Sequence, residues 1–464
     1  MTQIKKLNPK TRKKFYSICF EMVAVMATVG TLFFWKTPWA YAQVRVENAQ
    51  DIRDALQVYK FSKITSSVAD LKIAVIDYNF KDYDLPVGKF PPNYLPDSTE
   101  YHSFVENDQA KPATNHGFGM AQIVWTIFER NPYGPKFYLL NVAGISAFKK
   151  AADFIVENNI KIVLHAQTYD YGSNFDGVGP LTPHIKKVIE SGAFWVNAVG
   201  DYRNANFFGD VKFHEPTGEI QFPVDAGGNN TLKFENLTDN HNITITLSWS
   251  DYSESSTYAS RKDLDLFLFK SDGSQIEIPN RVQDGLEYGK VGPVFSREKV
   301  TLKLEKGIYS IRVKPKKAEN FIESDKFVVI LDTDNKGSVR FLKDPFNQIV
   351  LSPNDIKETI SVGDTSPFSS VARLLDGPEG TPGTVKPDFV MPFSQIKFSD
   401  GKTTQGTSNA SALFAGVLGR ILLEKPGFNR EQLMTYVSTL KADPKGRSPK
   451  MLKLWQTPFV SDLK

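Results

Sequence analysis

The sequence predicts an α/β protein in which a mostly parallel sheet, flanked by helices, is interrupted by an all-β sandwich. Before residue 200, short runs of β-branched and apolar residues alternate with helical patterns. Between about 216 and 344 helical periodicity disappears, and strand-like runs are separated by turns rich in Asn, Asp, Gly and Ser. A long amphipathic stretch at 406–422 then restores the helical pattern.

Length and composition indicate a globular protein of two or three domains. The chain has 464 residues, of which 41% are apolar and 23% charged. The net charge of +4 is misleading, because residues 1–42 hold seven Lys and Arg against one Glu and so carry +6. The remainder carries −2, and no basic patch argues for nucleic-acid binding.

The first 42 residues are typical of a secretory signal peptide. A basic segment precedes the mostly apolar run Phe15–Phe34, and Ala40-Tyr-Ala42 offers a cleavage site before Gln43. The length of the apolar run leaves an uncleaved membrane anchor as the alternative. The only cysteine, Cys19, lies in this leader, so the cleaved product would tolerate an oxidising compartment. We therefore expect export to the periplasm or the cell exterior.

The first α/β segment, 43–215, contains four expected strands, and two expected helices separate the last three of them. The strands are 71–76, 136–142, 160–165 and 193–199, and the helices are 147–158 and 182–191. Functional groups in parallel sheets gather at the carboxyl ends of the strands. Asp77 and Asp201 stand at or just past two of these ends, although either could be a plain turn residue.

The second α/β segment, 345–464, contains the predicted helix at 406–422. Its apolar residues recur at the spacing of a buried helix face, and Ser408 lies in its first turn. A serine there is either an N-cap or a nucleophile placed beside free backbone N–H groups.

The residues around Ser408 resemble the serine motif of the subtilisin-like serine proteases, Gly-Thr-Ser-x-Ala-[Ser/Thr]-Pro. The match runs from Gly406 to Ser411, and Ala412 replaces the proline. Upstream, Val385–Pro392 resembles the Lys-Pro-Asp segment of that family, and Ile360–Gly363 resembles the strand before it.

Two further segments resemble the same family in the same chain order. Lys72–Asp77 resembles the strand that delivers the catalytic aspartate, with Tyr78 and Asn79 departing from the motif. His116-Gly117 stands where the family carries its catalytic histidine, at the start of an expected helix; Phe118, Gly119 and Gln122 depart from the motif there. Without this context, His116 would be an ordinary loop residue.

The resemblance implies a catalytic triad of Ser408, His116 and Asp77. A serine hydroxyl needs a base to become a nucleophile, and neutral histidine has a suitable pKa. A carboxylate fixes the histidine tautomer and stabilises the imidazolium. The resemblance also implies that Asp201 stands where the family has an asparagine that donates to the oxyanion.

The segment 160–172 stands in the place of the family's substrate-binding edge. An extended peptide could pair with such an edge, with His165, Ala166 and Gln167 as substrate-binding residues. The equal alternative for His165 is a buried polar residue with a local partner.

The insert at 216–344 is predicted to form an antiparallel β-sandwich. Through Trp249-Ser-Asp251 and Asp263–Leu266 it resembles jelly-roll, pre-peptidase C-terminal-like domains. We expect no cofactor. A structural calcium at Asp263, Asp265, Asp332 and Asp334 is the less favoured alternative to solvated turns.

The sequence thus predicts an exported serine endopeptidase acting on peptide or protein substrates. The alternative is a subtilase fold with an impaired site that serves as an envelope binding protein. It is motivated by the departures from the family motifs at 78, 79, 118, 119, 201 and 412.

Overall fold

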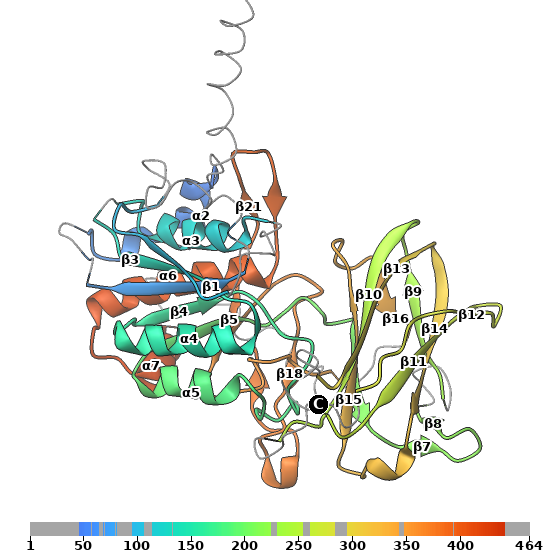
Figure 1. Ribbon diagram of the computed structural model, residues 1–464. Helices are drawn as coiled ribbons and strands as arrows, with labels where there is room; N and C mark the ends of the chain where they lie inside the picture. Colours follow the sequence, from blue (N-terminus) through green and yellow to red (C-terminus); the bar gives the residue numbers. More distant parts are fainter. Residues whose placement is uncertain are drawn as a thin grey trace, which may run out of the picture.

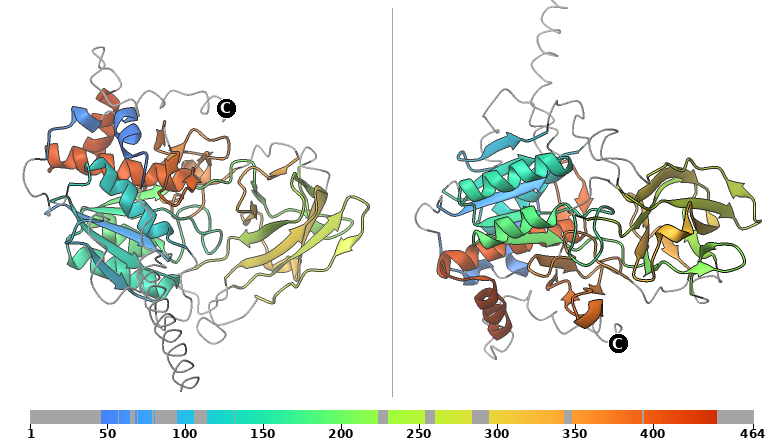
Figure 2. Two further views of the ribbon diagram at one scale, coloured as in Figure 1. Left: turned by 90° about the horizontal axis from the view of Figure 1, so that it is seen from above. Right: turned by 60° about the horizontal axis from the view of Figure 1, so that its bottom comes forward.

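The computed structural model describes residues 46–440 except 57, 65–67, 69, 79, 81–94, 106–113, 132, 224–229, 254–259, 284–294, 343–347 and 393. The predicted signal peptide at 1–42 lies outside the described residues. Within them, no helix is both long and apolar enough to cross a membrane. Two units lie side by side, an α/β unit and a β-sandwich (Figures 1 and 2).

The α/β unit is built on a seven-stranded sheet in which every neighbouring pair is parallel, in the order β2-β3-β1-β4-β5-β17-β20. Its strands are β1 (Lys72–Asp77), β2 (Glu100–Ser103), β3 (Lys136–Asn141), β4 (Ile162–His165), β5 (Phe194–Ala198), β17 (Ile360–Asp364) and β20 (Phe389–Met391). This confirms the predicted parallel sheet.

Helices cover both faces of this sheet (Figure 1). The side chains of β1 alternate, so Ile73 and Val75 join the core under one helix pair, while Ala74 and Ile76 join the core under the other. The first pair is α3 (His116–Ile127) and α6 (Thr407–Glu424), and the second is α4 (Gly144–Glu157) and α5 (Thr182–Glu190). Smaller elements are α2 (Ala49–Ala55), α7 (Arg430–Leu440), and the 3₁₀ turns Val58–Lys60, Ala318–Asn320 and Pro378–Gly380.

The helices α3 and α6 pack closely because glycine allows it. A Cβ on Gly416 of α6 would lie 2.7 Å from Cγ1 of Ile127 on α3, which is too close for any side chain. Both helices begin at the carboxyl edge of the sheet (Figure 1). The packing therefore brings the start of α3, with His116, and the start of α6, with Ser408, to the same edge.

The Lys-Pro-Asp segment has a structural role beneath α6. Lys386 is fully buried, and its Nζ lies 2.7 Å from Oδ2 of Asp388. Asp388 also accepts hydrogen bonds from the backbone N–H and the hydroxyl of Ser361 on β17, at 2.8 and 2.9 Å. Burial lowers the pKa of Lys386, and the Asp388 carboxylate opposes this shift. The buried ion pair lies within the segment, and the hydrogen bonds from Ser361 to Asp388 tie the segment to β17.

The second unit is an antiparallel β-sandwich, as predicted. A four-stranded sheet in the order β13-β10-β15-β6 faces a five-stranded sheet in the order β12-β11-β14-β9-β16. Their apolar side chains form one core, with Trp249 among the largest buried residues. The strands are β6 (Asn206–Asp210), β9 (Leu232–Asn236), β10 (His241–Trp249), β11 (Leu264–Lys270), β12 (Gln275–Ile276), β13 (Arg297–Leu304), β14 (Gly307–Pro315), β15 (Lys326–Asp332) and β16 (Val339–Phe341). Short two-stranded ribbons are β7 (Phe213–His214) with β8 (Glu219–Ile220), β18 (Ala372–Arg373) with β19 (Val385–Lys386), and β21 (Ile396–Lys397) with β22 (Thr403–Thr404).

The predicted start of the insert at residue 216 falls too late. Strand β6 pairs antiparallel with β15, from Asn206 opposite Ile330 to Asp210 opposite Lys326, and Phe207 lies in the sandwich core. The sandwich therefore begins just after Ala205. A single short strand gives no periodicity by which to assign it to one sheet or the other. The predicted end at 344 lies outside the described residues.

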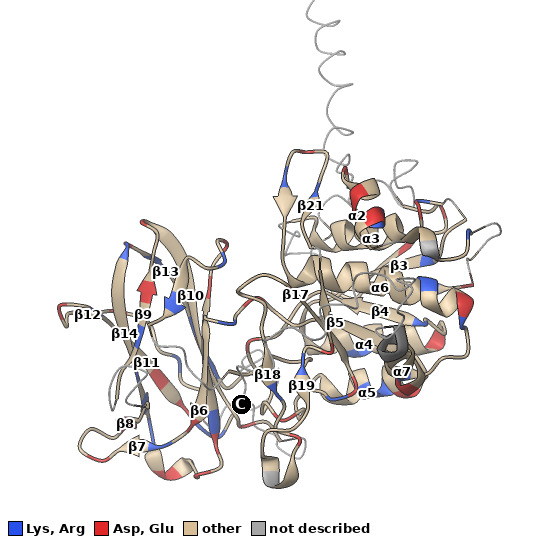
Figure 3. Cartoon of the chain, turned by 180° about the vertical axis from the view of Figure 1, so that it is seen from behind, with Lys and Arg blue, Asp and Glu red and all other residues tan. Residues whose placement is uncertain are grey.

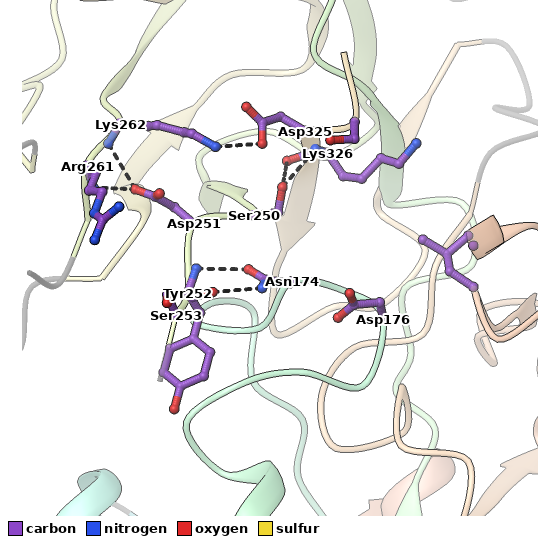
Figure 4. A pocket seen from close by; sticks show the side chains of 13 residues that line it. Asn174, Asp176, Ser250, Asp251, Tyr252, Ser253, Arg261, Lys262, Asp325 and Lys326 are labelled. Carbon is purple, nitrogen blue, oxygen red and sulfur yellow. Dashed lines mark hydrogen bonds and ion pairs between the residues drawn. The ribbon is translucent and has the colours of Figure 1, made fainter. Parts of the chain in front are cut away.

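Polar contacts join the two units around a hollow of about 470 Å³. Asn174 of the α/β unit donates to the carbonyl of Tyr252 at 2.9 Å and accepts its backbone N–H at 2.9 Å (Figure 4). Within the sandwich, Lys262 pairs with Asp325 at 2.6 Å in the wall of the same hollow (Figure 4). Charges of both signs are interspersed over the two units (Figure 3).

Candidate active site

A cleft of about 700 Å³ lies at the carboxyl edge of the parallel sheet. The segments after β4 and β5 line it, together with the starts of α3 and α6. Of the residues predicted from the sequence to form the site, His116, Ala166, Gln167, Asp201 and Ser408 line the cleft. The other two, Asp77 and His165, are fully buried.

Asp77 is the last residue of β1, and its carboxylate contacts Nδ1 of His116. Its Oδ2 lies 2.6 Å from Nδ1 of His116, and its Oδ1 accepts the backbone N–H of Tyr78 and the side-chain N–H of Gln167, each at 2.8 Å. The carboxylate is fully buried, whereas the His116 side chain keeps 31% of its surface exposed. The histidine therefore connects a buried carboxylate with the open cleft.

The electrostatics of His116 favour its protonated form. Burial of the ring lowers the pKa, but the Asp77 carboxylate outweighs burial, and Asp201 adds to its effect. The net result is a pKa above the usual value for histidine. With its raised pKa, His116 takes up a proton readily, and it becomes a neutral base only at a higher pH than an ordinary histidine.

Ser408 lies in the first turn of α6, and its hydroxyl donates to the carbonyl of Ala166 at 3.0 Å. Gly406 precedes the helix with a φ of +146°, a conformation that favours glycine. A Cβ at Gly406 would lie 2.9 Å from Oδ2 of Asp201, so a side chain there would collide with that carboxylate. The glycine lets the helix start close to Asp201.

Asp201 caps the start of α6. Its Oδ1 accepts the backbone N–H of Thr407 at 3.1 Å, and the hydroxyl of Thr407 accepts the N–H of Gly200 at 3.1 Å. A carboxylate is favoured at the positive end of a helix. Burial nevertheless raises the pKa of Asp201 to about 6; Thr407 opposes the shift and the Asp364 charge adds to it. The carboxylate is still mostly ionised at pH 7 to 8.

Two of the three predicted substrate-binding side chains are already engaged. The ring of His165 is fully buried, hydrogen-bonds Oδ1 of Asn197 at 2.6 Å and stacks on Tyr169 with ring centroids 5.7 Å apart. Burial lowers the pKa of His165 to about 4, which leaves the ring neutral at pH 7. Its prediction as a substrate contact is wrong, and the alternative of a buried residue with a local partner is what the structure shows.

Gln167 has a role that the sequence did not suggest. Its side chain donates to Asp77, so it positions the carboxylate that holds His116. Its backbone carbonyl accepts from Nδ2 of Asn197 at 3.0 Å. No motif in the sequence marks a glutamine separated from Asp77 by three strands and two helices. Only the pairing of β1 with β4 brings them together.

The predicted calcium ligands separate into two groups. Asp263 and Asp265 lie with Glu298, and one carboxylate oxygen of each lies within 4.8 Å of the others. Asp332 and Asp334 line the cleft instead. Glu298 accepts hydrogen bonds from the backbone of Arg281 at 2.6 Å and from Gln283 at 2.7 Å. The expectation that the protein needs no cofactor stays a prediction.

Comparison with known proteins gives structural neighbours only. No family model and no curated protein matches the chain. A lanthipeptide protease is 12% identical at a TM-score of 0.37, over 85% of this chain and 87% of that one. Sphericase is 12% identical at 0.35, over 84% and 88%, and the epidermin leader peptide processing serine protease of Staphylococcus aureus is 10% identical at 0.33, over 88% and 75%.

At these identities the likeness concerns the fold alone. Because the TM-scores are low, the candidate site is defined by the geometry of this chain. That geometry is a parallel sheet between two helix layers, with an Asp at the end of β1, a His at the start of α3 and a Ser at the start of α6. The chain therefore has an α/β fold with an additional β-sandwich.

Proposed function

We propose that the protein is an exported subtilisin-like serine endopeptidase. The observation that carries this proposal is that His116 stands between the buried Asp77 carboxylate and a cleft that Ser408 also lines. A base that is oriented by a carboxylate, in one cleft with a serine at a helix start, is the arrangement that acyl transfer needs.

The proposed reaction begins when the Ser408 hydroxyl turns from the Ala166 carbonyl to Nε2 of His116. The Ser408 oxygen attacks the peptide carbonyl, and His116 takes the hydroxyl proton. Asp77 stabilises the imidazolium that forms. In this proposal the backbone N–H of Ser408, at the start of α6, stabilises the oxyanion.

Collapse of the tetrahedral intermediate breaks the C–N bond, and His116 returns the proton to the leaving amine. His116 then takes a proton from a water molecule, whose oxygen attacks the Ser408 ester. The C–O bond to Ser408 breaks, His116 returns the proton to the Ser408 oxygen, and the acid product leaves. Each half of the reaction thus begins with a neutral His116 and regenerates it.

A binding protein with an impaired site is the second candidate. Two observations favour it. At position 201, where the resembled family has an asparagine that donates to the oxyanion, this chain has a carboxylate that lies beside Gly406. In addition, the Ser408 hydroxyl donates its hydrogen bond to the Ala166 carbonyl. In that case the cleft would hold a peptide without cleaving it.

A serine-directed fluorophosphonate separates the two candidates. We expect the purified wild-type protein to be labelled on Ser408, as located by peptide mass spectrometry, and Ser408→Ala to remain unlabelled. Ser191→Ala, at the end of α5, is the matched control and should be labelled like the wild type. Equal labelling of wild type and Ser408→Ala would rule out the protease.

Export is supported by the leader sequence alone. If residues 1–42 are a cleaved signal peptide, the mature protein recovered outside the cytoplasmic membrane begins at or near Gln43. N-terminal sequencing measures this. An intact N-terminus on membrane-bound material would support the uncleaved anchor instead.

A further inference from the structure

The β-sandwich supplies one part of the cleft wall. Lys299 of β13, Asp332 at the end of β15, and Asp334 and Lys336 in the turn that follows all line the cleft together with His116 and Ser408. The β-sandwich is therefore part of the candidate site, because its charged side chains line the same cleft as the candidate catalytic groups.

This wall is held in place by contacts on both sides of the cleft. Oδ2 of Asp170, in the α/β unit, accepts hydrogen bonds from the Thr246 hydroxyl at 2.7 Å and from Nζ of Lys299 at 2.8 Å. The Asp170 side chain keeps only 17% exposure. Nζ of Lys336 lies 4.8 Å from the centroid of the Tyr202 ring. Tyr202 directly follows Asp201 in the chain.

Backbone contacts reinforce the same junction. The N–H of Leu331 on β15 donates to the carbonyl of Ala205 at 2.8 Å, and the N–H of Phe341 on β16 donates to Asn204 at 3.0 Å. The reciprocal pair between Asn174 and Tyr252 lies farther along the junction (Figure 4). The loop that carries Asp201 is thus anchored to the sandwich, and the wall has a defined position relative to it.

The charges of this cleft do not balance. Among the described residues that line it, four carry a carboxylate and two carry an ammonium group. A protonated His116 is balanced by the buried Asp77 carboxylate, so the excess is two negative charges. Lys299 pairs with Asp170, and Lys336 pairs with Asp332. The excess therefore falls on Asp201 and Asp334, and Asp334 is exposed.

We propose that the sandwich wall makes the cleft selective for peptide segments that carry lysine or arginine, with Asp334 as the specificity-determining residue. A cationic side chain gains attraction from Asp334, and an anionic segment is repelled by both excess carboxylates. As a statement about which substrates are cleaved, this inference rests on the proposed function. As a statement about which peptides bind, it does not depend on the proposed function.

The test measures peptide binding to the full chain carrying Ser408→Ala, which prevents cleavage. Two fluorescein-labelled peptides differ only in having Lys or Glu at the same positions, and fluorescence anisotropy gives their affinities at low and high salt. We expect the Lys peptide to bind more tightly and the difference to shrink with salt. Adding Asp334→Asn should weaken binding of the Lys peptide by about twofold to fivefold, the size of one exposed charge contact.

Two further variants give the test its controls. Glu319→Gln, an exposed carboxylate in the sandwich that does not line the cleft, should leave both affinities unchanged. Lys336→Gln should strengthen binding of the Lys peptide, because it removes the partner of Asp332. Equal affinities for the two peptides, absence of binding, or an equal loss with Glu319→Gln would overturn the inference.

Failure of this inference is distinguishable from failure of the proposed function. Fluorophosphonate labelling reports on Ser408 and does not depend on Asp334. If labelling fails while the preference for the Lys peptide holds, the protein is a binding protein with a cation-selective cleft. If labelling succeeds and the preference is absent, the protease proposal stands and the selectivity proposal falls.

Discussion

Asp77→Asn is expected to lower kcat by about 10⁴-fold, the size of effect known for this substitution in a serine-protease triad. The asparagine would place an N–H donor or a weaker acceptor against Nδ1 of His116, where the carboxylate now lies at 2.6 Å. The imidazole would then lose both its fixed tautomer and the charge that stabilises its protonated form.

A second measurement separates this explanation from simple misfolding. Because Asp77 raises the pKa of His116 against the effect of burial, Asp77→Asn should lower that pKa, as an NMR titration of the ring would show. Asp355→Asn is the matched control, since Asp355 is another buried aspartate that does not line the cleft. A loss of less than tenfold with Asp77→Asn would remove Asp77 from the mechanism.

Asp201→Asn is expected to raise turnover at pH 7 to 8, by up to the factor of about 10²–10³ that one oxyanion donor contributes in subtilisin. An ionised carboxylate offers acceptors only and repels a developing oxyanion. The asparagine can keep Oδ1 on the Thr407 N–H, now 3.1 Å away, and turn its amide N–H toward the cleft.

The pH dependence of the wild type follows from the two shifted groups. Asp201 becomes a donor only when it gains a proton, below its pKa of about 6, whereas His116 is a base only above its own raised pKa. The state with a protonated Asp201 and a neutral His116 is therefore a minority at every pH. The wild type should show a low, bell-shaped maximum at mildly acidic pH.

In Asp201→Asn the acidic requirement disappears, and activity should rise with pH until His116 is neutral and then level off. Pre-steady-state or kcat/KM profiles from pH 5 to 9 on an uncharged peptide measure the change. Asp334→Asn removes the same charge from the same cleft and should leave the shape of the profile unchanged. An Asp201→Asn variant that folds normally but keeps the wild-type profile would show that another donor serves the oxyanion.

Local sequence patterns were sufficient for most of the architecture. Apolar runs predicted the central strands of the parallel sheet, and the 3.6-residue spacing after Gly406 predicted α6. Motifs at three separated places predicted that Asp77, His116 and Ser408 belong together. The hydrogen bond from His116 to Asp77 and the shared cleft agree with that expectation.

The sequence by itself therefore determined the two units and the residue types at the carboxyl edge of the sheet, because those depend on short-range periodicity and on motifs. Only the tertiary structure decided what depends on contacts between distant segments. It buried His165 against Asn197, joined Gln167 to Asp77, and placed β6 in the sandwich. It also brought Asp334 to the cleft. All these contacts depend on strand pairing and on the packing of the two units, and neither leaves a pattern in the local sequence.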